Sequence, residues 1–174
     1  MIVKKICNIL STLVLLVLLA AAAVLLVPML FGYKEMVVVS GSMEPAIPVG
    51  SLVYVKPLEA DQLETRDICT YYLSDRETFV THRVMSIDKG AQTLVTQGDA
   101  NDTEDGDVSF SQVYGRAEFH LPYLGIAIQN LHTSAGIMII CGVIMLVILL
   151  NFIPAILDAA EEEKQQKDTS VKQS

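Results

Sequence analysis

Two long apolar segments frame the chain, and a stretch of alternating apolar and polar residues separates them. The first segment runs from Ile9 to Phe31 with only Ser11 and Thr12 as polar residues, and the second runs from Ala135 to Leu157. A helix of about 20 apolar residues is long enough to cross the hydrocarbon core of a bilayer. The pattern therefore predicts two membrane-spanning helices.

Each apolar segment also has an alternative interpretation. Lys4 and Lys5, followed by the small residues Ala20 to Ala23, are compatible with a cleaved signal peptide. The apolar part of a signal peptide is usually about 7–15 residues long, so this longer run favours an uncleaved anchor. The second segment is compatible with a buried core helix, but it is apolar on all sides and a domain this small could hardly cover it. We therefore expect both segments to span the membrane.

Lysines flank the two predicted spans at the outer ends of the chain. Lys4 and Lys5 precede the first span, and Lys164, Lys167 and Lys172 follow the second. Cytoplasmic flanks of membrane spans collect Lys and Arg, so we expect both termini in the cytosol and the middle of the chain outside it. The predicted organisation is 1–31 for the N-terminus and first span, 32–133 for an extracytoplasmic domain, 134–157 for the second span and 158–174 for a polar cytosolic tail.

The middle segment alternates short runs rich in Val, Ile, Thr, Tyr and Phe with turn-forming Gly and Pro residues. Short strands at close spacing, without long helices between them, are typical of a sheet or a partly open barrel. The expected fold class is therefore a mainly β domain flanked by two transmembrane α-helices. The predicted strands are Met36–Ser40, Ser51–Lys56, Asp67–Leu73, Thr78–Ile87, Thr93–Gln97, Val113–Phe119 and Ile126–Gln129.

Charge and cysteine content narrow the function of this middle segment. The whole chain has a formal net charge of −8, and residues 32–133 hold 15 acidic against 7 basic residues. Binding to nucleic-acid phosphates needs a basic face, so we expect no nucleic-acid partner. Cys69 is the one cysteine of this segment, which excludes a disulfide within it, and its apolar neighbours predict a buried strand position.

Two short segments of the domain carry residues suited to covalent catalysis. The segment MVVVSGSMEP places Ser42 on a turn just after a predicted strand, where a serine nucleophile is held rigidly and exposed. The segment FVTHRV places His82 within a strand, and imidazole is the side chain that most readily exchanges a proton near neutral pH. Taken singly, the two residues also fit a polar turn and a structural histidine.

A third segment, TQGDANDTEDGD, gathers five acidic residues after a predicted strand. From Asn101 it partly follows the spacing of a calcium-binding EF-hand loop, but Asn101 and Gln112 stand where that loop has Asp and Glu. A non-enzymatic alternative follows: a membrane-anchored β-domain that binds calcium or a protein partner through this acidic loop. Otherwise the sequence has no metal-type Cys or His spacing, and we expect no metal and no cofactor.

Taken in order, these segments resemble a known family, although no single segment is specific to it. Four segments in this order together resemble signal peptidase I. They are SGSMEP at 40–45, HRV about 40 residues after Ser42, GDAND about 17 residues further on, and VYGRAEFHLPYLG at 113–125. The histidine is similar to the serine–histidine branch of that family, found in the endoplasmic reticulum, in archaea and in some Gram-positive bacteria. The rest of the family has a lysine at the matching position.

The resemblance implies roles for individual residues. Ser42 matches the nucleophile and His82 the general base. Asp105 matches the acid of the triad and Asp99 a second important acid, and either could be the acid that orients His82. Ser40 matches the residue whose hydroxyl, with the Ser42 N–H, binds the oxyanion. A catalytically silent family subunit is disfavoured because Ser42 and His82 are both present.

The resemblance also implies the substrate, although three positions of this chain depart from the family pattern. It implies removal of signal peptides from exported preproteins by cleavage after small residues in an Ala-x-Ala pattern. Substrate is expected to contact Met36, Val37, Val38, Val39 and Met43. The expected partners are such preproteins, the lipid bilayer and the export translocon. The family commonly has Lys at Gln97, Gly-Asp at Gly50-Ser51 and Gly-Asp at Arg66-Asp67.

The compartment follows from one observation. The region between Gly106 and the second apolar segment is short, which favours a bacterial plasma membrane. In a eukaryote the same topology would place the protein in the endoplasmic reticulum membrane.

Overall fold

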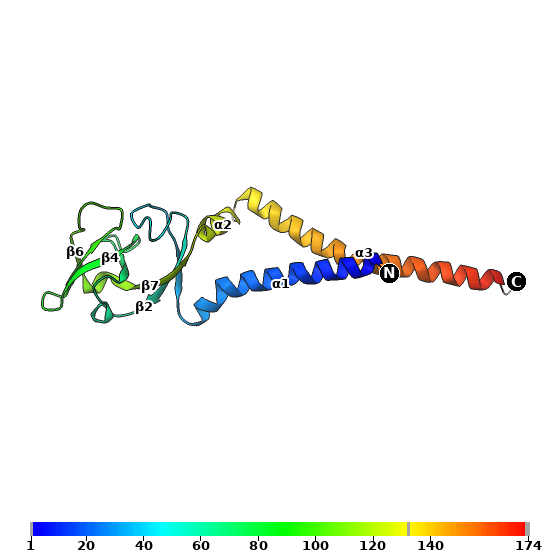
Figure 1. Ribbon diagram of the computed structural model, residues 1–174, viewed down its shortest axis with the longest axis horizontal. Coiled ribbons are helices and arrows are strands. Elements are labelled where there is room, and N and C mark those ends of the chain that lie inside the picture. Colours follow the sequence, from blue (N-terminus) through cyan, green and yellow to red (C-terminus); the bar gives the residue numbers. More distant parts are fainter. Residues whose placement is uncertain (1, 132, 173–174) are drawn as a thin grey trace. The chain divides into compact units, whose positions relative to one another are not determined.

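The computed structural model describes residues 2–131 and 133–172, so the last two residues of the predicted tail lie outside the described residues. The chain divides into two compact units. One unit is Leu25–Asn130 and contains the strands, and the other is formed by the helical residues that precede and follow it (Figure 1).

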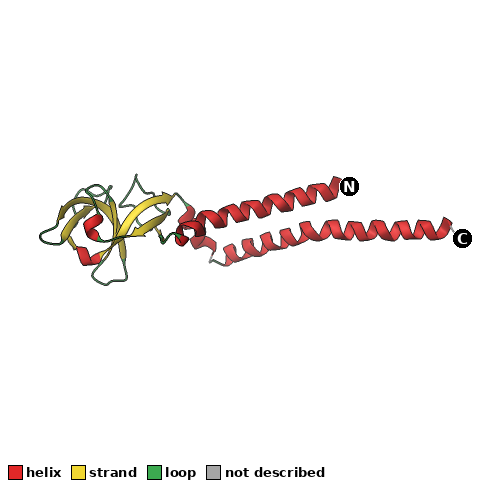
Figure 2. Cartoon of the chain, turned by 90° about the horizontal axis from the view of Figure 1, so that it is seen from below, coloured by secondary structure: helices red, strands yellow, loops and turns green. Residues whose placement is uncertain are grey.

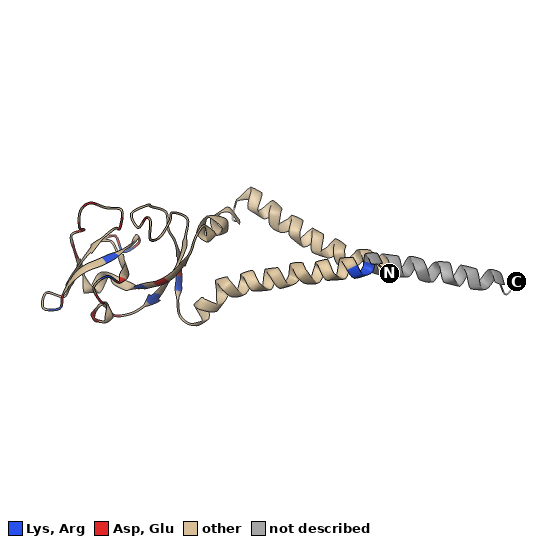
Figure 3. Cartoon of the chain, viewed as in Figure 1, with Lys and Arg blue, Asp and Glu red and all other residues tan. Residues whose placement is uncertain are grey.

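Both apolar segments are helical. Helix α1 covers Ile2–Leu30 and helix α3 covers Ser134–Lys172, and their stretches Lys4–Leu30 and Ser134–Ile153 are each long and apolar enough to cross a bilayer. Charged residues in α1 are confined to its N-terminal end (Figure 3). Helix α3 continues beyond the predicted end of the second span at 157, because the following residues are mostly Ala, Glu, Lys and Gln, which are strong helix formers.

The β unit is one antiparallel sheet that curls into a half-barrel (Figure 2). Its strands lie in the order β1-β2-β7-β3-β4-β5-β6. The predicted mainly β fold with two flanking apolar helices is therefore confirmed. The strands are β1 (Lys34–Val37), β2 (Leu52–Pro57), β3 (Ile68–Tyr72), β4 (Phe79–Asp88), β5 (Thr93–Gln97), β6 (Asp107–Ser109) and β7 (Val113–Leu121), with short 3-10 turns at Ala60–Gln62 and Phe110–Gln112.

Two apolar clusters hold the curled sheet together. One packs residues of β3, β4, β5 and β6 around buried Cys69, and the other packs the turn after β1 against β2. Removing such side chains from water is the main favourable term in folding. The first cluster is Leu63, Cys69, Tyr71, Val84, Leu94 and Val108, and the second is Met43, Ile47, Val53 and Val55.

The prediction of a strand at Ile126–Gln129 is wrong. These residues belong to helix α2, Leu124–Leu131. Strand β7 ends at Leu121, and Tyr123 has a positive φ of 61° directly before the helix begins. After it, apolar residues recur at Leu124, Ala127, Ile128 and Leu131, the spacing of one helix face.

The sequence patterns also missed β6 and displaced β1. Strand β6 has three residues and follows directly on the acidic loop, so it has too few positions to show an alternation. Strand β1 ends at Val37 rather than Ser40. Pairing continues one residue further through the Val38 N–H, which donates to the Ser51 carbonyl at 2.9 Å, and the chain then leaves the sheet.

Candidate active site

Ser42 lies on the turn that leaves β1. Its Oγ lies 3.3 Å from the Oγ of Ser40, which is exposed. The Ile47 N–H donates to the Met43 carbonyl at 2.8 Å, which closes the turn immediately after Ser42. The buried side chains of Met43 and Ile47 anchor this turn in the core, so the Ser42 hydroxyl is held at a defined position at the rim of the sheet.

The loop after β5 fastens the other side of this turn. The Ala100 N–H donates to the Ser42 carbonyl at 2.9 Å. Gly98 lies so close that a Cβ atom on it would come within 2.6 Å of the same carbonyl oxygen. Glycine is therefore required at this position by the close approach of two backbones.

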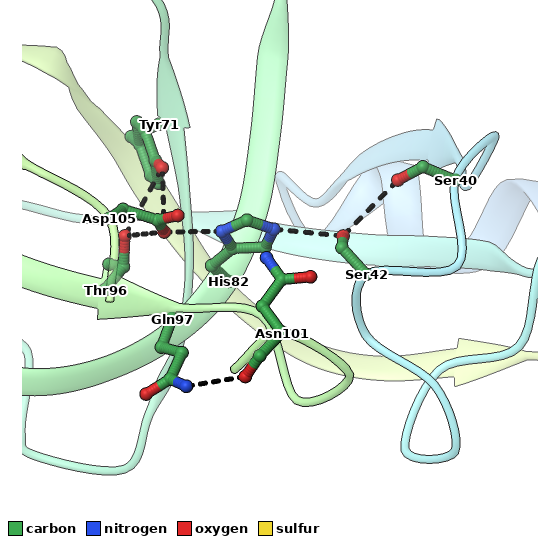
Figure 4. A network of polar contacts seen from close by, with 8 residues as sticks. All are labelled: Ser40, Ser42, Tyr71, His82, Thr96, Gln97, Asn101 and Asp105. Atoms are coloured by element: carbon green, nitrogen blue, oxygen red, sulfur yellow. Dashed lines mark hydrogen bonds and ion pairs between the residues drawn. The ribbon is translucent and has the colours of Figure 1, made fainter. Parts of the chain in front are cut away.

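His82 lies between Ser42 and Asp105 (Figure 4). It is a residue of β4, opposite Cys69 of β3, and is 8% exposed. Its Nε2 lies 2.9 Å from Ser42 Oγ, and its Nδ1 lies 2.6 Å from Asp105 Oδ2. Three side chains from distant parts of the sequence therefore form one continuous row of hydrogen bonds.

The partners of the imidazole determine which nitrogen carries the proton. An ionised carboxylate only accepts hydrogen bonds, so Nδ1 donates to Asp105. In the neutral ring Nε2 is then the acceptor, and the Ser42 hydroxyl donates to it. This is the arrangement in which an imidazole can remove a proton from a serine hydroxyl.

The two candidate acids occupy different positions. Asp105 contacts His82, whereas the Asp99 carboxylate receives two hydrogen bonds from the Arg83 guanidinium, at 2.7 and 2.6 Å. Arg83 also donates to the Arg66 carbonyl at 2.9 Å. The structure therefore brings Asp105 to the imidazole, and Asp99 instead joins the loop after β5 to strand β4.

A cavity of about 350 Å³ opens beside Ser42 and His82. All five residues expected to contact substrate line it, namely Met36, Val37, Val38, Val39 and Met43. Strand β4 contributes Phe79, Val80 and Thr81 to the lining, and Ile47 and Val53 also line the cavity. The lining is mostly apolar, and polar groups gather where Ser40, Ser42 and His82 meet the cavity.

The acidic loop has two of its carboxylates engaged within the protein. Asp99 is paired with Arg83 and Asp105 with His82. Within residues 2–131 and 133–172, no group of three or more His, Cys, Asp or Glu side chains is arranged to hold a metal ion.

The positions that depart from the family pattern have local partners. The Gln97 side-chain amide donates to the Asn101 carbonyl at 2.6 Å and braces the loop after β5. The buried Ser51 hydroxyl donates to the Pro48 carbonyl at 2.6 Å. Arg66, where the family commonly has Gly, has a φ of 80° and thus a backbone conformation that favours glycine.

Two polar residues near Asp105 were missed by the sequence patterns. Thr96 of β5 and Tyr71 of β3 both contact the Asp105 carboxylate. The sequence held one signal for Thr96: it lies two positions after Leu94 in a short predicted strand, so the two side chains are expected on the same, inward face. Burial raises the pKa of the Tyr71 hydroxyl, and burial raises the pKa of the neighbouring Cys69 thiol to about 12.

Comparison with known proteins identifies relatives. No protein-family model matches the chain. It is 41% identical over 81 residues to signal peptidase I W of Bacillus subtilis (strain 168), covering 45% of this chain and 42% of that protein. It is 32% identical over 101 residues to the signal peptidase complex catalytic subunit SEC11C of Homo sapiens, covering 52% and 53%.

The chain is homologous to signal peptidases. It spans about half the length of the curated relatives that it matches. The resemblance inferred from SGSMEP, HRV and GDAND is thus confirmed, since the relatives include a bacterial signal peptidase I and a catalytic subunit of a signal peptidase complex.

Proposed function

We propose that this protein is a membrane-bound serine endopeptidase that removes signal peptides from exported preproteins. The observation that carries the proposal is the position of His82, within hydrogen-bonding distance of both Ser42 and Asp105. The homologous signal peptidases support the reaction and the class of substrate.

In the proposed reaction His82 acts first as a base and then as an acid. Its Nε2 takes the Ser42 proton while Oγ forms a bond to the scissile carbonyl carbon, and Asp105 stabilises the imidazolium that results. When the carbon–nitrogen bond breaks, the imidazolium returns the proton to the leaving amine. Water then hydrolyses the acyl-enzyme by the same sequence of proton transfers.

The negative charge that develops on the carbonyl oxygen needs donors. The Ser42 N–H and the Ser40 hydroxyl are proposed to supply them. The separation of 3.3 Å between the two serine oxygens supports this role for Ser40, since it lies next to the attacking atom. Donors already aimed at the developing charge lower the barrier because they need no reorganisation during the reaction.

The substrate is proposed to bind as an extended strand along β1. Among the described residues, β1 is the first strand of the sheet and has β2 as its single strand neighbour, so its other edge can pair with a peptide. The valines of this segment border the cavity that leads to Ser42. Its apolar lining suits the small side chains of an Ala-x-Ala segment that precedes the scissile bond.

Membrane attachment is proposed to provide much of the selectivity. A pocket for a small side chain discriminates by about 1–3 kcal/mol for each methylene group. An enzyme and a preprotein held in the same bilayer meet at a high effective concentration. The lysines that flank the two apolar segments support cytosolic termini and an extracytoplasmic β unit. The membrane is proposed to be the plasma membrane or the endoplasmic reticulum membrane, with the export translocon as a partner.

The decisive experiment is a cleavage assay with the full chain in detergent and a purified preprotein. Ser42→Ala and His82→Ala are each expected to lower kcat at least about 1000-fold, because each removes a group that forms or breaks a bond. His120→Ala, which changes a histidine of β7 away from this row, is the matched control and is expected to keep wild-type kcat.

The non-enzymatic alternative makes the opposite prediction. A β-domain that acts only by binding through its acidic loop would be unaffected by Ser42→Ala. Cleavage at the wild-type rate by the Ser42→Ala variant, purified free of host peptidases, would therefore refute the proposed function.

A further inference from the structure

The hydrogen-bonded row does not end at Asp105. Cys69 and Tyr71 of β3 face His82 and Val80 of β4 across the ladder, and Thr96 of β5 faces Val84 of β4. Side chains paired across antiparallel strands share one face of the sheet. Tyr71, His82 and Thr96 therefore come from three adjacent strands on a single face.

These three residues converge on one atom. Asp105 Oδ2 is 2.6 Å from His82 Nδ1, 2.7 Å from Thr96 Oγ1 and 3.4 Å from the Tyr71 hydroxyl oxygen (Figure 4). The Thr96 and Tyr71 hydroxyls are themselves 3.3 Å apart. The Asp105 N–H donates to the Thr96 carbonyl at 2.7 Å, so Thr96 binds both the backbone and the side chain of Asp105.

The surroundings make these contacts stronger than similar contacts at the surface. Thr96 is 0% exposed and Tyr71 is 4% exposed, and Tyr71 belongs to the apolar cluster around Cys69. A hydrogen bond to a charged group is strengthened by a low local dielectric. The Asp105 side chain is 25% exposed, so without these donors it could turn towards water and leave the imidazole.

We propose that Thr96 and Tyr71 are positioning residues that hold the Asp105 carboxylate against Nδ1 of His82. Neither hydroxyl contacts Ser42, and neither residue lines the substrate cavity. Their effect is on the orientation and tautomer of the imidazole. The inference rests on the proposed function, because it assigns these residues to the same reaction.

The first test separates kcat from KM in the preprotein cleavage assay. Thr96→Val keeps the shape of the side chain but removes the hydroxyl, and is expected to lower kcat about 10- to 100-fold while KM changes less than about twofold. Thr96→Ser restores the hydroxyl and is expected to recover kcat to within about threefold of wild type. Tyr71→Phe removes the longer contact and is expected to lower kcat about threefold.

A matched control separates positioning from a general loss of stability. Tyr54 is a fully buried tyrosine of β2 whose hydroxyl donates to the Leu25 carbonyl at 3.2 Å, away from the row. Tyr54→Phe therefore removes a comparable buried hydrogen bond and is expected to keep wild-type kcat. If Thr96→Val does not fold, the test is the comparison of Tyr71→Phe with Tyr54→Phe. Equal kcat values for these two variants would overturn the proposal.

A second readout does not depend on turnover. In the full chain labelled with ¹⁵N-histidine in detergent micelles, the proton on His82 Nδ1 is expected to give a downfield signal that His82→Ala removes. Thr96→Val is expected to shift or broaden this signal, and Thr96→Ser to restore it. An unchanged signal and unchanged kcat in folded Thr96→Val would overturn the positioning role. If the variants show the expected signal changes but the wild-type chain cleaves no preprotein, the proposed function alone would be refuted.

Discussion

The two ring nitrogens of His82 lie in different environments. Its Nε2 faces Ser42 at the edge of a cavity, and its Nδ1 faces a carboxylate whose other partners are buried. A ring bonded on both sides has one orientation and one neutral tautomer, so little rearrangement is needed before a proton moves. Cys69, which faces His82 across the ladder, and Tyr71 belong to the adjoining apolar cluster, so buried side chains flank the ring on the Asp105 side.

The Ser40 hydroxyl has a separate test. If it helps to bind the oxyanion, Ser40→Ala is expected to lower kcat about 100- to 1000-fold, equivalent to about 2.7–4 kcal/mol, without abolishing cleavage. Initial rates on a saturating preprotein substrate measure this effect. Ser86→Ala, on an exposed position of β4, is the control, and a Ser40→Ala rate equal to that of the control would exclude the oxyanion role.

Cys69 makes a prediction about alkaline pH. Burial raises the pKa of its thiol to about 12, so the unfolded chain ionises this group at lower pH than the folded protein does. Its contribution to stability is therefore complete below about pH 8.5 and is lost as the pH rises towards the folded value. In the folded protein at pH 9, maleimide is expected to leave Cys69 unmodified while modifying Ala91→Cys on the exposed β4–β5 turn. Rapid modification of Cys69 without denaturant would contradict its burial.

Strand β4 and the loop after β5 do most to assemble the candidate site. Strand β4 supplies His82 and, at the next position, Arg83, which binds Asp99 of the loop. The same loop contacts the Ser42 carbonyl through Ala100 and delivers Asp105 to the imidazole. Connections between strands that carry reactive groups on a rigid sheet are a common way to build a site.

The turn before β3 contains a residue in an unfavourable backbone conformation. Arg66 has a φ of 80°, and its N–H donates to the Val84 carbonyl at 2.8 Å, so the conformation is held by the sheet. Arg66→Gly removes the steric cost of a Cβ atom and is expected to raise the free energy of unfolding by about 1 kcal/mol. Chemical denaturation of the two proteins in the same detergent measures it. Arg66→Ala keeps the Cβ atom and is the control, and equal stability of the Gly and Ala variants would show that the conformation carries no strain.

The two long helices contain polar residues that meet each other. Asn151 of α3 donates through Nδ2 to Ser11 Oγ of α1 at 2.9 Å, and also to the Val147 carbonyl at 2.7 Å. An amide inside an apolar segment is costly unless its hydrogen bonds are satisfied. This contact therefore favours pairing of the two helices.

The proposed topology is testable on the complete protein. In a chain with Cys7 and Cys141 replaced by Ala, a single new cysteine at Ala91 is expected to react with a membrane-impermeant maleimide on intact cells. A new cysteine at Gln166 is expected to react only after the membrane is made permeable. The reverse pattern would place the β unit in the cytosol, where it could not meet an exported chain.

Local patterns along the chain were enough to predict the two apolar helices, most of the strands and the mainly β fold, because hydrophobic periodicity reports which face of an element is buried. They failed at Ile126–Gln129, where four residues carry too little periodicity to separate a strand from a helix. Kinship with signal peptidases followed from the order of SGSMEP, HRV and GDAND along the chain.

The meeting of Ser42, His82 and Asp105 could not be read from spacing, since nothing local relates residues that are 40 and 23 positions apart. The register of β3, β4 and β5 brings the imidazole beside the Asp105 carboxylate and adds Thr96 and Tyr71 to it. Such contacts depend on how the sheet curls and pairs, which is a property of the whole packed domain. The sequence by itself thus determines the chemical identity of each group, whereas long-range strand pairing determines which groups meet.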